Sequence, residues 1–179
     1  MIRFSPSFLV IIALIFLVSC NSTETAVNSQ PQTVISPPQQ QVTVDENTQI
    51  VMGQTIYVPV YSHIYHQNRQ NIFPLSVTLS IRNTDLNQPL IVTSVRYYDS
   101  EGNLVKEYLE SPIQLNQLAS TDFFVTRNDT TGGSGANFIV EWIAESEISE
   151  PFIEAVMIGT DSQQGISFVG QSRVIKTLP

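Results

Sequence analysis

The sequence predicts an all-β protein whose domain is an antiparallel, immunoglobulin-like β-sandwich of about eight strands. From Gly53 onward, apolar and polar residues alternate in short segments, which is the pattern of half-buried strands. Turn-forming Gly, Asn, Asp and Pro residues separate these segments at close intervals. Only 13% of the residues are charged, and no segment keeps the period of about 3.6 residues that an amphipathic helix requires.

The first twenty residues have the pattern of a bacterial lipoprotein leader. Arg3 precedes an apolar run over residues 8–18, which is shorter than the roughly 20 residues of a membrane span and has the length of a signal-peptide core. The run ends in Ser19 and Cys20, and this ending resembles the lipoprotein box, in which the cysteine thiol is lipidated. We therefore expect residues 1–19 to be a signal peptide and Cys20 to carry the lipid. The alternatives are an ordinary signal peptide with an incidental cysteine, or an uncleaved anchor.

Residues 20–49 are predicted to form a disordered tether between the lipid and a domain over residues 50–179. Asn, Ser, Thr, Gln and Pro dominate this segment, so little apolar surface is available for burial. Alternatively its end pairs with the domain, because Val42 and Val44 alternate as in an edge strand. Asn21 stands where some bacteria place an inner-membrane retention signal, Asp. We therefore expect a lipid-anchored protein of the bacterial cell envelope, with the periplasmic face of the outer membrane favoured over the inner membrane.

The domain begins with a predicted strand over residues 54–62, which carries Ile56, Val58 and Val60 on one side. Pro59 cannot donate a ladder hydrogen bond, so this strand is expected at a sheet edge. A hairpin turn is expected over residues 100–103. The other predicted strands cover residues 75–82, 90–98, 104–109, 113–115, 120–126, 137–143, 152–158, 166–169 and 173–175.

A glycine-rich loop over residues 132–135 precedes the strand that carries the only tryptophan. Alternation on that strand predicts that Phe138, Val140 and Trp142 face the core. A phosphate-binding loop requires Lys and then Ser or Thr after its last glycine, followed by a helix, whereas Ala136 and a strand follow here. We therefore expect no nucleotide cofactor. A structural turn with positive φ angles is predicted, and a recognition loop is the alternative.

The candidate binding residues are Tyr57, Tyr61, His63, Tyr65, Asp129, Ser134 and Asn137. Tyr57, Tyr61 and Tyr65 share a parity, so a regular strand would present them as one aromatic stripe suited to recognising proteins or sugars. Alternatively another sheet or the tether covers this stripe.

His63 and His66 are weak candidates for metal ligands. A turn would bring residues three apart onto one face, whereas a continuous strand would point them to opposite faces. A hydrogen-bonded surface histidine is the favoured interpretation. No metal or cofactor is predicted. No constellation of nucleophile, base and carboxylate emerges from the sequence, so no catalytic group is predicted and the protein is not expected to be an enzyme.

Four segments resemble a bacterial family known as domain of unknown function 3124. They are GQTIYVPVYSHIY over residues 53–65, LSIRNTD over 79–85, GGSGANFIVEW over 132–142 and EAVMIGT over 154–160. The resemblance covers roughly residues 53–175. It implies a secreted protein or lipoprotein of a kind found in many cyanobacteria, and it implies no activity and no catalytic residues.

Charge excludes one class of partner. The formal net charge is −8 and no basic block occurs, whereas nucleic-acid binding requires clustered Lys and Arg. The sequence therefore favours a binding module for an envelope protein or a small ligand, attached to a membrane by its lipid. The tyrosine stripe and the loops over residues 129–137 and 161–165 are its candidate surfaces. A structural or assembly lipoprotein of a larger envelope complex is the alternative, and a metal-dependent or other hydrolase has the least support.

The leader predicts a simple experiment. Replacing Cys20 by Ala removes the thiol that would be lipidated, so Cys20→Ala should release the protein from membranes or block its processing. Membrane fractionation and intact-mass measurement test this expectation. An unchanged mass together with unchanged membrane retention would refute lipidation at Cys20.

Overall fold

The computed structural model describes residues 40–160 and 165–178, and within them the chain forms thirteen β-strands and one short 3-10 helix, η1 (Gly133–Gly135). The strands are β1 (Gln40–Gln41), β2 (Met52–Pro59), β3 (His63–His66), β4 (Asn68–Pro74), β5 (Ser76–Arg82), β6 (Leu90–Tyr98), β7 (Leu104–Glu107), β8 (Ile113–Leu115), β9 (Ser120–Val125), β10 (Asn137–Ala144), β11 (Phe152–Gly159), β12 (Ile166–Gln171) and β13 (Arg173–Leu178). No helix in these ranges is long and apolar enough to cross a membrane. Cys20 and residues 161–164 lie outside them.

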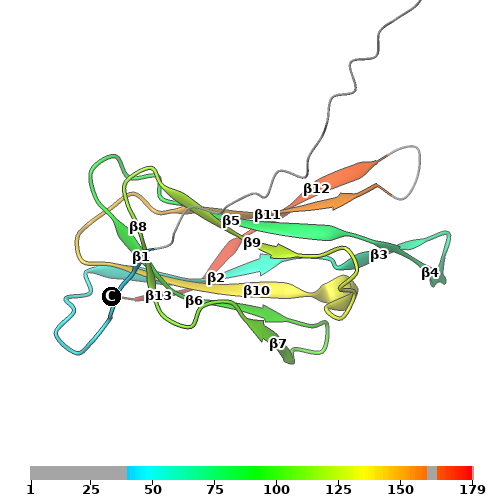
Figure 1. Ribbon diagram of the computed structural model, residues 1–179, viewed down its shortest axis with the longest axis horizontal. Helices are drawn as coiled ribbons and strands as arrows, with labels where there is room; N and C mark the ends of the chain where they lie inside the picture. Colours follow the sequence, from blue (N-terminus) through cyan, green and yellow to red (C-terminus); the bar gives the residue numbers. More distant parts are fainter. Residues whose placement is uncertain (1–39, 161–164, 179) are drawn as a thin grey trace, which may run out of the picture. The chain divides into compact units, whose positions relative to one another are not determined.

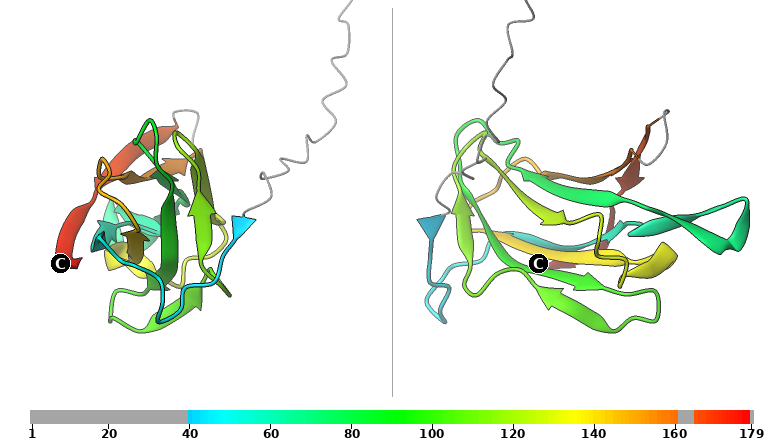
Figure 2. Two further views of the ribbon diagram at one scale, coloured as in Figure 1. Left: turned by 90° about the vertical axis from the view of Figure 1, so that its left-hand side faces the viewer. Right: turned by 45° about the vertical axis from the view of Figure 1, so that its right-hand side comes forward.

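Two antiparallel sheets form the layers of a sandwich (Figures 1 and 2). The larger sheet has seven strands, in the order β1-β8-β6-β10-β2-β13 with β7 paired to β6. The smaller sheet has four strands, in the order β12-β11-β5-β9. β3 and β4 pair only with each other and project from one end as a ribbon (Figure 1). The predicted all-β antiparallel sandwich is confirmed, with more strands than the roughly eight expected, and β3 and β4 lie outside every predicted strand range.

The core lies between the two sheets and is centred on β10. Phe138, Val140 and Trp142 alternate along β10 and are fully buried, as the sequence predicts. From β5, Leu79 and Ile81 are equally buried in the same cluster. Burying each large apolar side chain contributes about 1.5–3 kcal/mol, so these alternating positions account for much of the packing energy.

The prediction that the first strand lies at a sheet edge is wrong. β2 lies between β10 and β13, and its Tyr57 is opposite both Ile139 and Arg173. Pro59 is tolerated because it is the last residue of β2, where the pairing with β13 has already ended and only Asn137 of β10 lies opposite. The predicted inward side of this strand is confirmed, since Ile56, Val58 and Val60 are all buried.

The end of the predicted tether joins the domain. Gln40 lies opposite Gln114 and Gln41 opposite Ile113, so β1 adds an edge strand to the larger sheet. The Val42 amide then donates to the Pro112 carbonyl at 2.9 Å. The edge-strand alternative therefore holds, two residues earlier than Val42 and Val44 suggested. Residues 20–39 of the tether lie outside the described ranges.

The loop after β5 is built on a buried asparagine. Asn83 is 2% exposed, and its Nδ2 donates to the carbonyl oxygens of Gln88 (2.8 Å), Leu115 (3.2 Å) and Asn116 (3.1 Å). Its Oδ1 accepts from the Asp85 amide at 2.9 Å. One side chain thus ties the β5–β6 loop to the β8–β9 connection. Such a buried amide stabilises only while its hydrogen bonds are made.

This loop predicts a large loss of stability for Asn83→Ala. The change leaves buried carbonyl groups without a donor, and we expect a loss of about 2–3 kcal/mol in the free energy of unfolding. Asn87→Ala is the matched control, because Asn87 is an exposed asparagine of the same loop. The control should change stability by less than about 0.5 kcal/mol. Urea denaturation measures both, and equal losses in the two variants would contradict this account of the loop.

Candidate functional site

The glycine-rich loop is fastened to its surroundings by two serines. Ser100 Oγ donates to the Gly132 carbonyl at 3.0 Å and accepts from the Gly135 amide at 2.8 Å. The Gly133 carbonyl accepts from both the amide (3.0 Å) and the hydroxyl (3.2 Å) of Ser62. Gly133 has φ +77°, which confirms the predicted positive φ. The Gly133 amide donates to the Thr130 carbonyl at 3.2 Å. The Gly133 and Gly135 amides are therefore used within the protein, so the loop acts as a structural turn.

Gly132 is required by close packing rather than by its φ angle. A Cβ atom at this position would lie 1.8 Å from the Tyr97 hydroxyl oxygen, a distance no side chain can accept. Tyr97 is buried beneath the loop, and its ring lies 5.0 Å from that of Phe138 in the core. The loop therefore seals one end of the sandwich over Tyr97.

The predicted loop residues have local structural contacts. Asp129 Oδ1 accepts from the amide and the hydroxyl of Thr131, which closes a tight turn. Ser134 lies in η1 and is half-buried. Asn137 is the first residue of β10, opposite Pro59 of β2 and Tyr98 of β6.

The predicted tyrosine stripe is broken, because the first strand does not stay regular. β2 ends at Pro59, and the chain re-enters a separate ribbon at β3. Tyr57 stays on the outer side of the larger sheet, and Tyr65 is on the ribbon. Tyr61 lies between them and packs edge-on against Phe168 of β12, with ring centroids 5.7 Å apart. These tyrosines therefore belong to three different surroundings.

Both histidines lie on the ribbon. His63 is half-buried and stacks edge-on with Tyr65 at 5.7 Å, whereas His66 is exposed at the end of β3, next to the turn residue Gln67 with φ +60°. Over residues 40–160 and 165–178, no group of three or more His, Cys, Asp or Glu side chains is placed to hold a metal ion.

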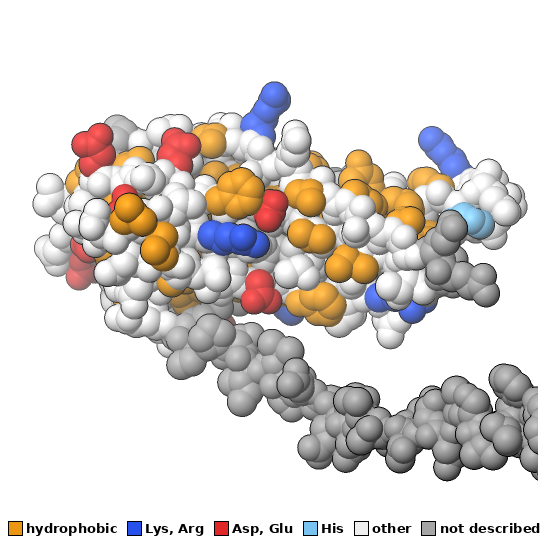
Figure 3. Space-filling model, turned by 90° about the horizontal axis from the view of Figure 1, so that it is seen from above, with side chains coloured by type: hydrophobic (Ala, Val, Ile, Leu, Met, Phe, Trp, Pro, Cys, Tyr) orange, Lys and Arg blue, Asp and Glu red, His pale blue; other side chains and the backbone are white. Residues whose placement is uncertain are grey.

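An apolar surface that alternation along single strands did not predict lies on the outer side of the four-stranded sheet, and we call it the apolar face. Val156 lies opposite Val169 and Thr78, and Thr78 lies opposite Phe124, so these side chains form one row across four strands. The exposed members of the face are Phe124 (51%), Phe152 (52%), Ile158 (43%) and Val169 (51%), with Val156 half-buried among them. Figure 3 shows the hydrophobic side chains gathered there.

The sequence of β11 contains the pattern that could have indicated this face. Phe152, Val156 and Ile158 point outward, while Ile153 and Met157 point into the core. A strand that is apolar at both parities is typical of one with both faces covered. In this structure, however, only the inner side of β11 is buried.

Charged side chains lie within the apolar face. Arg82 and Glu154 are 3.7 Å apart, and Arg82 Nε donates to Ser80 Oγ at 3.0 Å. Asp122 and Glu154 flank Ser80 in the same row, and Figure 3 shows basic and acidic groups among the hydrophobic ones. Open pockets adjoin this pair: one of about 410 Å³ is lined by Phe152, Glu154 and Val169, and one of about 470 Å³ by Arg82 and Asp122.

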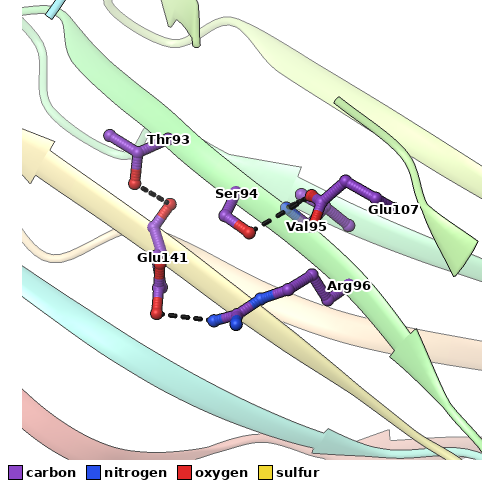
Figure 4. A network of polar contacts seen from close by, with 6 residues as sticks. All are labelled: Thr93, Ser94, Val95, Arg96, Glu107 and Glu141. Atoms are coloured by element: carbon purple, nitrogen blue, oxygen red, sulfur yellow. Dashed lines mark hydrogen bonds and ion pairs between the residues drawn. The ribbon is translucent and has the colours of Figure 1, made fainter. Parts of the chain in front are cut away.

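The outer side of the seven-stranded sheet carries a network of charged and polar groups where β6 pairs with β7 and β10. Arg96 Nη2 pairs with Glu141 Oε1 at 2.7 Å, and Glu107 Oε1 accepts from Ser94 Oγ (3.2 Å) and from the Val95 amide (3.3 Å). Figure 4 shows these groups, which come from β6, β7 and β10. Glu141 alternates with the buried Val140 and Trp142 and so lies on the outer side, where the Arg96 guanidinium holds its carboxylate.

Two tyrosines near the glycine-rich loop are held in their neutral form. Burial, and then the nearby charge of Asp129, raise the pKa of Tyr97 to about 12 from an ordinary value of 10.0. The same causes raise the pKa of Tyr108 to about 12. Burial acts in this direction because a phenolate loses hydration in the protein interior.

These shifts predict a loss of stability at alkaline pH. The unfolded chain releases both protons above about pH 10, whereas the folded chain keeps them until about pH 12. Stability is therefore fully present below pH 10 and falls as the pH rises through this window. Denaturant midpoints measured between about pH 9 and 11.5 should fall less steeply for Tyr97→Phe than for the wild type. Identical slopes would show that Tyr97 ionises equally in both states.

Residues 53–175 match the family described as "Protein of unknown function (DUF3124)". This interval runs from β2 into β13 and so includes strands of both sheets. No curated protein and no solved structure matches the chain. Because the match covers more than half of the sequence and agrees with the four motifs that suggested it, the chain belongs to the DUF3124 family.

Proposed function

We propose that this protein is a lipid-anchored binding module of the bacterial cell envelope and that its partner is another envelope protein, docked on the apolar face. The envelope location rests on the leader pattern that ends in Cys20. The choice of surface rests on the structure of the four-stranded sheet, and it replaces the tyrosine stripe as the candidate docking surface.

One observation carries the proposal: large apolar side chains are exposed together on an open sheet. Scattered exposed apolar residues are common on monomeric proteins, whereas contiguous ones mark interaction sites. Phe124, Phe152 and Val169 each keep about half of their surface exposed and come from three different strands. Covering these side chains would contribute a free energy of about 25 cal/mol for each Å² of apolar area removed from water.

The charges within the apolar face favour a protein over a lipid surface as the occupant. Arg82, Asp122 and Glu154 lie among the apolar groups, and inserting them into acyl chains would be costly. Protein interfaces combine aromatic side chains and Arg with a polar rim. The described contacts give the Asp122 carboxylate no ion-pair or hydrogen-bond partner, so a cationic side chain of the docked protein would pair with Asp122.

Binding rather than catalysis is part of the proposal. Its support is the character of the apolar face, where Arg82 and Glu154 lie 3.7 Å apart and the adjoining pockets are open to solvent. Such a surface suits complementarity with a partner. Proton transfer or nucleophilic attack would call for an activated side chain in an enclosed pocket.

The size of the apolar face predicts a weak contact that the membrane strengthens. Strands of about seven residues at about 3.3 Å each, spaced about 4.8 Å apart, give a face on the order of 400 Å². Stable complexes bury about 800 Å² on each partner. Confinement of both proteins to one membrane would raise their effective concentration and compensate for this small area.

The proposal predicts that charges placed on the apolar face abolish docking. Phe124→Glu and Val169→Glu should each weaken the complex by about tenfold or more, because buried anchors dominate interface energies. Leu104→Glu is the matched control, since Leu104 is a 54% exposed strand residue of the other sheet. Crosslinking of the anchored protein in intact envelopes, followed by affinity measurement with the identified partner, tests the three variants.

The expected result is one partner at fixed stoichiometry that both face variants lose and the control retains. Equal recovery from all variants would overturn the choice of the apolar face. Loss of self-association alone would assign the face to a second copy of this chain, and would overturn the proposal of a different envelope protein.

A further inference from the structure

Two β-bulges occur at the same level of the seven-stranded sheet, on either side of β2 and β10. In β6, Thr93 is an extra residue, because Glu141 lies opposite Ser94 while Trp142 lies opposite Val92. In β13, Ile175 is extra, because Val174 lies opposite Ile56 while Lys176 lies opposite Thr55. Bulges redirect neighbouring side chains and occur often beside functional sites.

The two bulges flank a pocket on the outer side of the sheet. It has a volume of about 160 Å³, and Thr55, Thr93, Glu141 and Lys176 are among its lining residues. Register places Lys176, Thr55 and Glu141 in one row across β13, β2 and β10. A hydroxyl thus lies between a cationic and an anionic side chain.

An apolar wall completes this pocket. Ile143 and Leu178 line it and lie above Gly53, where an added Cβ would come within 3.1 Å of Ile143 Cγ2 and 3.0 Å of Leu178 Cδ1. The absence of a side chain at Gly53 therefore leaves room for these two side chains over the backbone of β2. A ligand in the pocket would meet polar groups at one side and methyl groups at the other.

The charges of the pocket favour an anion. Glu141 is already neutralised, because its Oε1 lies 2.7 Å from Arg96 Nη2. Thr93 Oγ1 donates to the Glu141 carbonyl at 3.2 Å and so is turned toward β10 (Figure 4). Glu107, one strand further out, is engaged by Ser94 and Val95. Lys176 is exposed, and no ion pair of the described residues includes it.

From this geometry we infer that the pocket between the bulges binds the carboxylate group of a small molecule or of a peptide end. Lys176 pairs with the carboxylate, the Thr55 hydroxyl donates to it, and Ile143 and Leu178 contact a short aliphatic tail. Charge-assisted hydrogen bonds of this kind are about twice as strong as neutral ones. The volume is below the roughly 300 Å³ of pockets for drug-sized ligands, so only a few heavy atoms enter.

This inference is independent of the docking proposal, because the pocket and the apolar face lie on the outer sides of different sheets. Amide chemical shifts of the full domain are followed during titration with propionate, with its neutral analogue propionamide, with alanine and with dialanine. Propionate should produce saturable shifts at Thr55, Thr93 and Lys176, and propionamide should not. The relative affinities of alanine and dialanine then distinguish a free small molecule from a peptide end.

Variants make the test specific. Lys176→Gln should weaken propionate binding by about tenfold or more, and Thr55→Val should weaken it by a smaller factor. Lys106→Gln is the matched control, since it removes the same charge from an exposed position on β7 and should leave the affinity unchanged. The inference is overturned if no carboxylate saturates these shifts at a ligand concentration of about 10 mM, which is about ten times the dissociation constant of a millimolar site. Equal binding of propionamide, or equal weakening by the two lysine variants, would also overturn it.

Discussion

Burial of the inner side of β10 is the interaction on which the rest of this domain depends. Phe138, Val140 and Trp142 are fully enclosed between the sheets, and β10 is paired along its length with β6 and β2. Because successive side chains of a strand point to opposite sides, burying these three places Ile139 and Glu141 on the outside. The position of Glu141 on the outer side of the seven-stranded sheet is therefore a consequence of how the core is filled.

The glycine-rich loop extends this constraint to the end of the sandwich. Ser62 and Ser100 hold the loop from β2's end and from the β6–β7 turn, and Gly132 allows it to lie directly on Tyr97. The glycines of this loop predicted a structural turn, with a recognition loop as the alternative. Its backbone hydrogen bonds are made within the protein, so its role is to close the core and to fix where β10 begins.

The outer surfaces of the two sheets differ in chemistry, and the difference suggests separate roles. The four-stranded sheet carries exposed Phe124, Phe152 and Val169, whereas the seven-stranded sheet carries the Arg96–Glu141 pair and a small pocket between bulges. An apolar surface suits a protein partner, and a compact polar pocket suits a small anion. The two proposals thus concern separate surfaces of one domain.

Local alternation in the sequence predicted most strands of the two sheets, the inward side of β2 and β10, and the turn after β6, where Gly102 has φ +85°. It did not predict the β3–β4 ribbon. The predicted features depend on neighbouring residues only, which is why period and turn chemistry predict them. Only the tertiary structure decided which strands lie side by side. It placed β2 inside a sheet, split the tyrosines among three surroundings, and brought Phe124 into one row with Val156 and Val169. Pairing between strands far apart in the chain has no local signature, so surfaces assembled from several strands emerge only when the sheets form.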